Sequence, residues 1–168
     1  MRYSRIAALT LALAVIAPLA APLTAQDVGI RLGTMAPAST IQSLSGSSVK
    51  LAKWIGKTPM VIEFWATWCE SCHELEPKMI AAAKKYAKSV KFVGVAVSVN
   101  QSPKLVARYA KNHALPFEIL YDRRGDATEA FDVPATSYVV ALDRSGKVVY
   151  TGVGGNQDIE AAVRKALK

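Results

Sequence analysis

The stretch EFWATWCESC, residues 63–72, contains both cysteines of the chain, Cys69 and Cys72. It overlaps a run, residues 60–66, that is rich in β-branched and aromatic side chains and lacks polar alternation, which predicts a strand buried on both faces. From Cys72 to about Lys88 the apolar residues recur at helical spacing, which predicts an amphipathic helix. The two cysteines are therefore expected where a buried strand ends and a helix begins.

This position suits the pair to redox chemistry. The first turn of a helix presents unpaired N–H groups and the positive end of the helix dipole, and both stabilise a thiolate. In such sites the pKa of a cysteine falls from about 8.5 to between about 3.5 and 7.5. We therefore expect Cys69 to attack a disulfide. Cys72, one turn further along and more buried, is expected to stay protonated until it attacks Cys69 and resolves the mixed disulfide.

The flanking segments predict an α/β domain with a mixed sheet and helices on both faces. Buried strands alternate with amphipathic helices, which points to parallel crossovers, and hairpins are expected at both ends. The expected elements are a hairpin and short turn within residues 28–58, strands at 90–99 and 117–121, a helix that begins at Ser102-Pro103, a helical turn at 125–131, a hairpin of 137–142 with 147–151, and a last helix capped at Asp158 or a neighbour.

The run around the cysteines resembles the active-site strand and turn of the thioredoxin superfamily. Pro77, five residues after Cys72, matches the proline within the family's helix, and residues 133–136, VPAT, resemble the loop that carries its cis-proline. The N-terminal hairpin and the strand and helix around residues 90–113 are similar to the secreted TlpA/ResA-like branch. The resemblance implies a thioredoxin-like fold over about residues 30–168, with an N-terminal β-hairpin and a central βα insertion.

The resemblance also implies a thiol-disulfide oxidoreductase of the protein-disulfide reductase type, as in cytochrome c maturation or oxidase copper-site assembly. It implies no cofactor besides the Cys69–Cys72 disulfide. Pro134 in cis would shape a groove for an extended client segment; the alternative is an ordinary trans turn before a strand. The other residues expected at this groove are Trp68, Glu70, Ser71 and Val133.

Glu63 is an acidic residue within the strand that is expected to be buried. A buried carboxylate is costly unless it is paired or protonated, so we expect a raised pKa. In the thioredoxin pattern this position, six residues before the first cysteine, carries an acid that moves a proton for the second cysteine. The alternative is an ion pair with a lysine such as Lys91 or Lys147, and both interpretations remain open at this stage.

Two other functions are consistent with the same residues. CESCH, residues 69–73, also matches the attachment pattern of c-type haem. Cys69, Cys72 and His73 could instead bind copper(I) or zinc in a metal chaperone. The position of the motif between a strand and a helix favours the redox interpretation. His113, the other histidine, is expected near the end of a helix, as a solvated residue or one that compensates the helix dipole.

The N-terminal segment has the pattern of a secretory leader. Two arginines precede an uncharged stretch, residues 6–17, and small side chains place cleavage after Ala25. The expected division is a signal peptide over residues 1–25 and a thioredoxin-like domain over 26–168. An uncleaved anchor over the uncharged residues 6–25 is the alternative, against which Pro18 and Pro22 argue. Periplasmic localisation follows, where a cysteine pair can oxidise.

The composition excludes several classes of protein. A length of 168 residues with 51% hydrophobic and 20% charged side chains is typical of a single globular domain. The formal charge of +8 is scattered and accompanies no nucleic-acid-binding motif, so no nucleic-acid partner is expected. The expected partners are a client protein that contains a disulfide and a membrane thiol electron donor, and the chain is expected to be a monomer.

Overall fold

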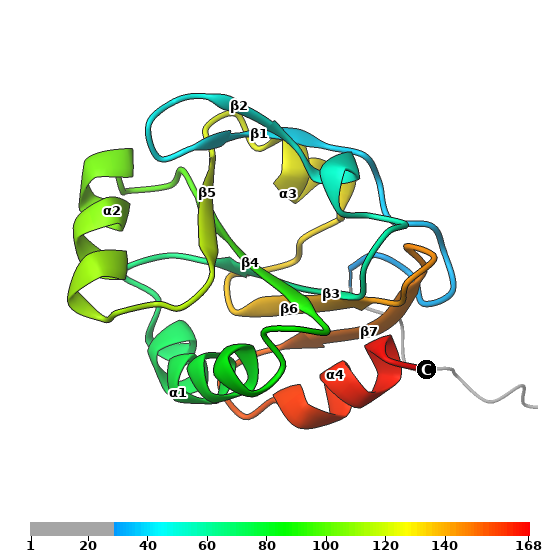
Figure 1. Ribbon diagram of the computed structural model, residues 1–168. Coiled ribbons are helices and arrows are strands. Elements are labelled where there is room, and N and C mark those ends of the chain that lie inside the picture. Colours follow the sequence, from blue (N-terminus) through cyan, green and yellow to red (C-terminus); the bar gives the residue numbers. More distant parts are fainter. Residues whose placement is uncertain (1–28) are drawn as a thin grey trace, which may run out of the picture.

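The computed structural model describes residues 29–168, so the expected signal peptide, residues 1–25, lies outside the described residues (Figure 1). The described chain forms one mixed sheet of seven strands in the order β2-β1-β5-β4-β3-β6-β7. The elements are β1 (Thr40–Ser43), β2 (Ser48–Lys50), the 3-10 helix η1 (Leu51–Lys53), β3 (Met60–Trp65), α1 (Glu70–Lys85), β4 (Lys91–Val97), α2 (Pro103–Asn112), β5 (Glu118–Asp122), α3 (Asp126–Ala130), β6 (Tyr138–Leu142), β7 (Val148–Val153) and α4 (Ile159–Ala166).

The strand that precedes the cysteines lies in the middle of the sheet. All six residues of β3 are buried, and the strand pairs parallel with β4 and antiparallel with β6. Its β-branched and aromatic side chains fill both faces, which explains why the sequence shows no polar alternation there. The prediction of a central buried strand is therefore confirmed.

Helices cover both faces of the sheet, as the pattern of the flanking segments predicted. In Figure 1, α1 and α4 lie on one face and α3 lies on the other. Leu75 of α1 packs in one core with Val61 of β3 and Ile159 of α4. On the opposite face, the ring centroid of Phe131, just after α3, is 5.4 Å from that of Phe64. Burial of each such side chain contributes about 1.5–3 kcal/mol, so the two cores fix the sheet between the helices.

The N-terminal hairpin and the central βα unit are both present. Strands β1 and β2 pair antiparallel, and β1 then pairs with β5 at the side of the sheet. Strand β4 lies between β3 and β5 and is parallel to both, and α2 follows it. The Ser102 hydroxyl accepts a hydrogen bond from the Leu105 N–H and caps α2, with Pro103 in its first turn.

Helix α1 differs from its expected bounds. It begins at Glu70 and ends at Lys85, whereas the periodicity predicted residues 72–88. The N–H groups of both Ser89 and Val90 bond the Tyr86 carbonyl and close the turn that leads into β4, which ends the helix early. Within residues 29–168, no helix is long and apolar enough to cross a membrane.

Candidate functional site

Cys69 and Cys72 form a disulfide at the N-terminus of α1. The two sulfurs are 2.10 Å apart, and both residues are buried. Cys69 is the N-cap of α1, and its Sγ accepts a hydrogen bond from the Cys72 N–H at 3.2 Å. The expected placement between a strand and a helix is confirmed. The same N–H that caps the helix is in place to stabilise negative charge on Cys69 after reduction.

Ser71 adds a second donor to the same sulfur. Its Oγ lies 3.5 Å from Cys69 Sγ, and because a disulfide sulfur carries no proton, the hydroxyl is the donor. Hydrogen bonds to an ionised acceptor are stronger than those to a neutral one. The serine between the cysteines therefore favours the thiolate of Cys69 over its thiol.

Ser137 is a site residue that the sequence analysis missed. It is fully buried, and its hydroxyl donates a hydrogen bond to the Ser71 carbonyl at 3.2 Å. Its backbone is in the left-handed region, with φ of 59°. The contact links the loop before β6 directly to the dipeptide between the cysteines. The only signal in the sequence was a small polar residue at the start of a buried strand.

The expectation of a cis bond at Pro134 is wrong. Among residues 29–168 every peptide bond is trans, and Pro134 is exposed. The loop reverses instead through two residues with positive φ, Asp132 and Ser137. Ser137, three positions after Pro134, makes the contact between this loop and the cysteine turn.

The other expected groove residues surround the disulfide unevenly. Trp68 is 49% exposed, and its Nε1 donates to the Val99 carbonyl at 2.8 Å, which holds the indole against the loop after β4. Glu70 is exposed at the start of α1. Val133 is half-buried and lines a surface pocket of about 370 Å³ together with Val97 and Val99. Apolar surface suited to a peptide segment thus lies next to Trp68.

Glu63 is buried in β3 without an ion-pair partner. It is 5% exposed, and Lys91, one of the lysines considered as its partner, pairs instead with Glu118 at 2.7 Å. Within residues 29–168 Glu63 forms no salt bridge with any lysine, so the ion-pair alternative is wrong. Burial, and to a smaller degree the negative charge of Glu76, raise the pKa of Glu63 to about 8. At neutral pH the side chain is therefore a carboxylic acid.

A small cavity connects this acid with the resolving cysteine. Its volume is about 10 Å³, close to the space that one water molecule needs. The Nε1 of Trp65, which lines the cavity, is buried without a hydrogen-bond partner. The residues around the cavity are Glu63, Trp65, Cys72, Glu76, Tyr109, Leu115 and Phe117. A proton held by Glu63 thus lies in the same enclosed space as the Cys72 side chain.

The ring of His73 contacts a backbone carbonyl and an aromatic ring, and neither of these is a metal ligand in a His/Cys site. Its Nε2 lies 3.1 Å from the Thr67 carbonyl oxygen, and its ring stacks on Tyr109. In the described part of the chain, no three His, Cys, Asp or Glu side chains come together in an arrangement that could hold a metal ion. The geometry therefore points to His73 as a residue that packs between α1 and α2.

Comparison with known proteins agrees with this geometry. The family model described as Redoxin matches residues 31–167. The chain is 33% identical over 130 residues to the thioredoxin-like protein YneN of Bacillus subtilis, covering 77% of this chain and 75% of that protein. It is 28% identical over 137 residues to the thiol-disulfide oxidoreductase ResA of Geobacillus kaustophilus, covering 80% and 78%.

A solved structure shares the fold. The secreted Mycobacterium tuberculosis disulfide oxidoreductase that is homologous to E. coli DsbE has a TM-score of 0.65 and 25% identity, covering 77% of this chain and 95% of that one. The region that the family model matches includes the strand, the cysteine turn and the helix described above. The chain belongs to the Redoxin family and is a TlpA/ResA-like thiol-disulfide oxidoreductase of the thioredoxin superfamily.

Proposed function

We propose that the protein is a periplasmic reductase of protein disulfides that uses the Cys69–Cys72 couple and no other cofactor. The observation that carries the proposal is the pair of donors on Cys69 Sγ, the Cys72 N–H at 3.2 Å and the Ser71 hydroxyl at 3.5 Å. Both stabilise the thiolate from which reduction starts. The disulfide in the structure is the oxidised state that follows one turnover.

The first half of the reaction transfers two electrons to the client. The Cys69 thiolate attacks one sulfur of the client disulfide, a mixed disulfide forms, and the other client sulfur leaves as a thiolate. Cys72 then gives its proton to the client thiolate released in the first step and attacks Cys69 Sγ. The second client thiolate is released, the client is reduced, and the Cys69–Cys72 disulfide is formed.

The second half restores the dithiol and uses the acid behind Cys72. A thiolate of the membrane donor attacks Cys69 Sγ, and Cys72 Sγ leaves with the electron pair of the disulfide bond. Glu63, protonated at neutral pH, supplies the proton that converts this sulfur to a thiol. A second donor thiol then resolves the mixed disulfide, so Cys69 is released and the donor is oxidised.

The surface beside the disulfide fits an extended client segment. Trp68 and Val99 are exposed apolar residues, and Val133 lines the adjoining pocket. Pro134 is exposed on the same loop. We place the client backbone along this loop, with its cysteine directed at Cys69. The basic, then uncharged pattern of residues 1–25 and the secreted relative support a periplasmic location.

Trapping tests the proposal. A Cys72→Ser variant expressed in its own host keeps the nucleophile but lacks the resolving thiol. We expect it to accumulate mixed disulfides that dithiothreitol releases and that mass spectrometry assigns to Cys69. The matched control is Cys69→Ser, which keeps one thiol in the same turn and is expected to capture nothing.

A second measurement is needed because trapping would capture nothing if the host did not make the client under the growth conditions used. The purified wild-type protein should accelerate the reduction of insulin by dithiothreitol, and Cys69→Ser should not. Capture by both variants alike would show that Cys69 is not the nucleophile. The absence of both captured clients and insulin reduction would overturn the reductase function.

A further inference from the structure

A second carboxylate lies behind the resolving cysteine. Glu76 is one turn after Cys72 on α1, and its side chain is 18% exposed. One of its oxygens accepts from the Tyr109 hydroxyl at 2.8 Å, and the other lies 2.7 Å from His113 Nδ1. Both partners belong to the end of α2, so two residues of the central βα unit hold one carboxylate of the active-site helix.

The rings around Glu76 keep this arrangement in place. The ring centroids of Tyr109 and His113 are 3.8 Å apart and stacked, and the His73 ring also stacks on Tyr109, with centroids 5.7 Å apart. Trp65 of β3 contacts the same tyrosine, with centroids 5.4 Å apart. Burial and the hydrogen bond to Glu76 raise the pKa of Tyr109, so its hydroxyl remains a donor.

Glu76 and Glu63 face the same small cavity. Besides these two carboxyl groups, Cys72 and Tyr109 line it. His113 contacts Glu76, and His73 stacks on Tyr109, but neither histidine lines the cavity. No lysine or arginine is among the described residues that line it. An ionised Glu76 therefore disfavours a second negative charge at Glu63, and no fixed positive charge on the cavity wall opposes this effect.

We propose that Glu76, held by Tyr109 and His113, is a positioning residue that makes Glu63 keep the proton required by Cys72 when its sulfur leaves. The inference rests on the proposed function and adds α2 to the active site. With Glu76 ionised and fixed, Glu63 is an acid when the disulfide opens. If the carboxylate were absent or turned toward solvent, Glu63 would ionise at lower pH and fewer molecules would carry the proton at neutral pH.

The test is a direct titration of Glu63 in the oxidised protein, in which the cysteines do not titrate. The carboxyl carbon of Glu63, assigned with a Glu63→Gln variant, is followed by ¹³C NMR as the pH changes. We expect Glu76→Gln to lower the midpoint of Glu63 by at least ~0.5 pH unit. Tyr109→Phe and His113→Gln should lower it less, because they free the Glu76 carboxylate without removing it.

The matched control is Glu74→Gln, which removes a carboxylate from an exposed position on the same helix. It should leave the Glu63 midpoint unchanged. Combining Tyr109→Phe with Glu76→Gln should add nothing to the effect of Glu76→Gln, because the tyrosine acts through Glu76. A second readout is the rate at which dithiothreitol reduces the disulfide, divided by the same rate in Glu63→Gln. The pH at which this ratio falls should shift in each variant together with the Glu63 midpoint measured by NMR.

The inference would be overturned if the titration midpoint of Glu63 were the same in Glu76→Gln as in Glu74→Gln. It would also be overturned if the effects of Tyr109→Phe and Glu76→Gln on this midpoint were additive. This outcome is separate from a failure of the proposed function. The titration is carried out on the disulfide form and needs no activity, whereas the trapping experiment does not depend on Glu76.

Discussion

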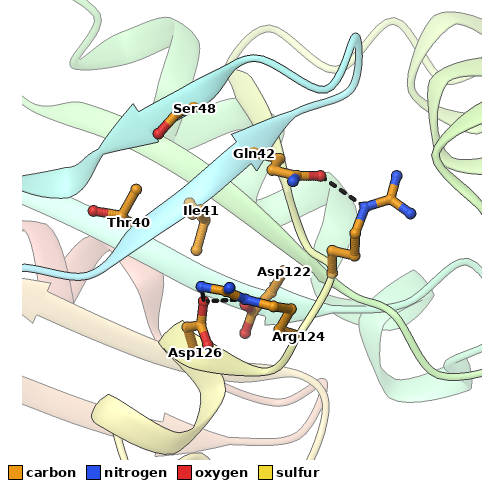
Figure 2. Close-up of a pocket in the computed structure, with 8 residues that line it drawn as sticks. Thr40, Ile41, Gln42, Ser48, Asp122, Arg124 and Asp126 are labelled. Atoms are coloured by element: carbon orange, nitrogen blue, oxygen red, sulfur yellow. Dashed lines mark hydrogen bonds and ion pairs between the residues drawn. The ribbon is translucent and has the colours of Figure 1, made fainter.

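Two acidic side chains are buried in the strands on either side of β4 and have opposite surroundings. Asp122, at the end of β5, is 1% exposed and accepts three hydrogen bonds: from the Thr128 hydroxyl at 2.7 Å, the Thr128 N–H at 2.8 Å and the Ala127 N–H at 3.3 Å. Figure 2 shows it beside the exposed ion pair of Arg124 and Asp126. Glu63, in β3, is 5% exposed, and its carboxyl group accepts no hydrogen bond from residues 29–168.

The difference separates a structural acid from a reactive one. The donors around Asp122 replace its hydration and join the end of β5 to the first turn of α3, so the cost of burying it is offset locally. Glu63 has no such donors, and its burial is tolerated because it holds a proton. A buried acid without donors, next to a disulfide, is therefore the one that can give its proton away.

The largest expected effect is on the stability of a Glu63→Gln variant at high pH. The folded wild-type protein keeps the Glu63 proton up to a pKa of about 8, whereas the unfolded chain releases it near 4.5. Stability from this group is thus fully present below pH 4.5 and is lost at about 1.4 kcal/mol per pH unit up to pH 8. Glutamine removes this loss, which amounts to about 5 kcal/mol.

Urea unfolding of both oxidised proteins at pH 4.5, 6, 7.5 and 9 measures the effect. The free energy of unfolding of the wild type should fall relative to that of Glu63→Gln across this range, and the two should be similar at the lowest pH. Parallel curves would show that Glu63 is ionised in the folded protein, and the contrast with Asp122 would be lost.

The next effect has the opposite sign. Asp122→Asn keeps the size of the side chain but replaces one acceptor oxygen with an NH₂ group that faces N–H donors. We expect the free energy of unfolding at pH 7 to fall by about 2 kcal/mol, because a buried donor loses its partner. A variant as stable as the wild type would mean that the hydrogen bonds to Thr128 and Ala127 do not stabilise α3.

The smallest effect isolates one of these hydrogen bonds. Thr128→Val keeps the branched shape and removes only the hydroxyl that donates to Asp122. We expect a loss of about 1 kcal/mol in the same urea unfolding experiment. The matched control is Thr58→Val, which removes the hydroxyl of another half-buried threonine, located before β3. A loss no larger than that of the control would contradict a role for the hydroxyl.

Much of the fold could be predicted from the sequence. The cysteine turn between a buried strand and a helix, the N-terminal hairpin and the alternation of strands and helices all match the structure. Ser102 and Asp158 cap their helices as expected. These features depend on side chains close in sequence, so hydrophobic period and capping chemistry are sufficient to identify them.

The contacts that complete the site could not be predicted from the sequence. Pro134 had the signature of the loop beside the cysteines, but the backbone places Ser137 there. His113 is exposed at the end of α2, as expected, but its pairing with Glu76, 37 positions away in the chain, was not predicted. No local pattern distinguishes such a pair from two surface residues.

By itself the sequence determined where the redox pair sits, because two cysteines after a buried strand and before a helix define that place through local preferences. Tertiary structure alone decided which groups surround the pair. The positions of Glu76, His113 and Ser137 follow from how α2 and the loop before β6 pack against α1, and packing is a property of the whole folded chain.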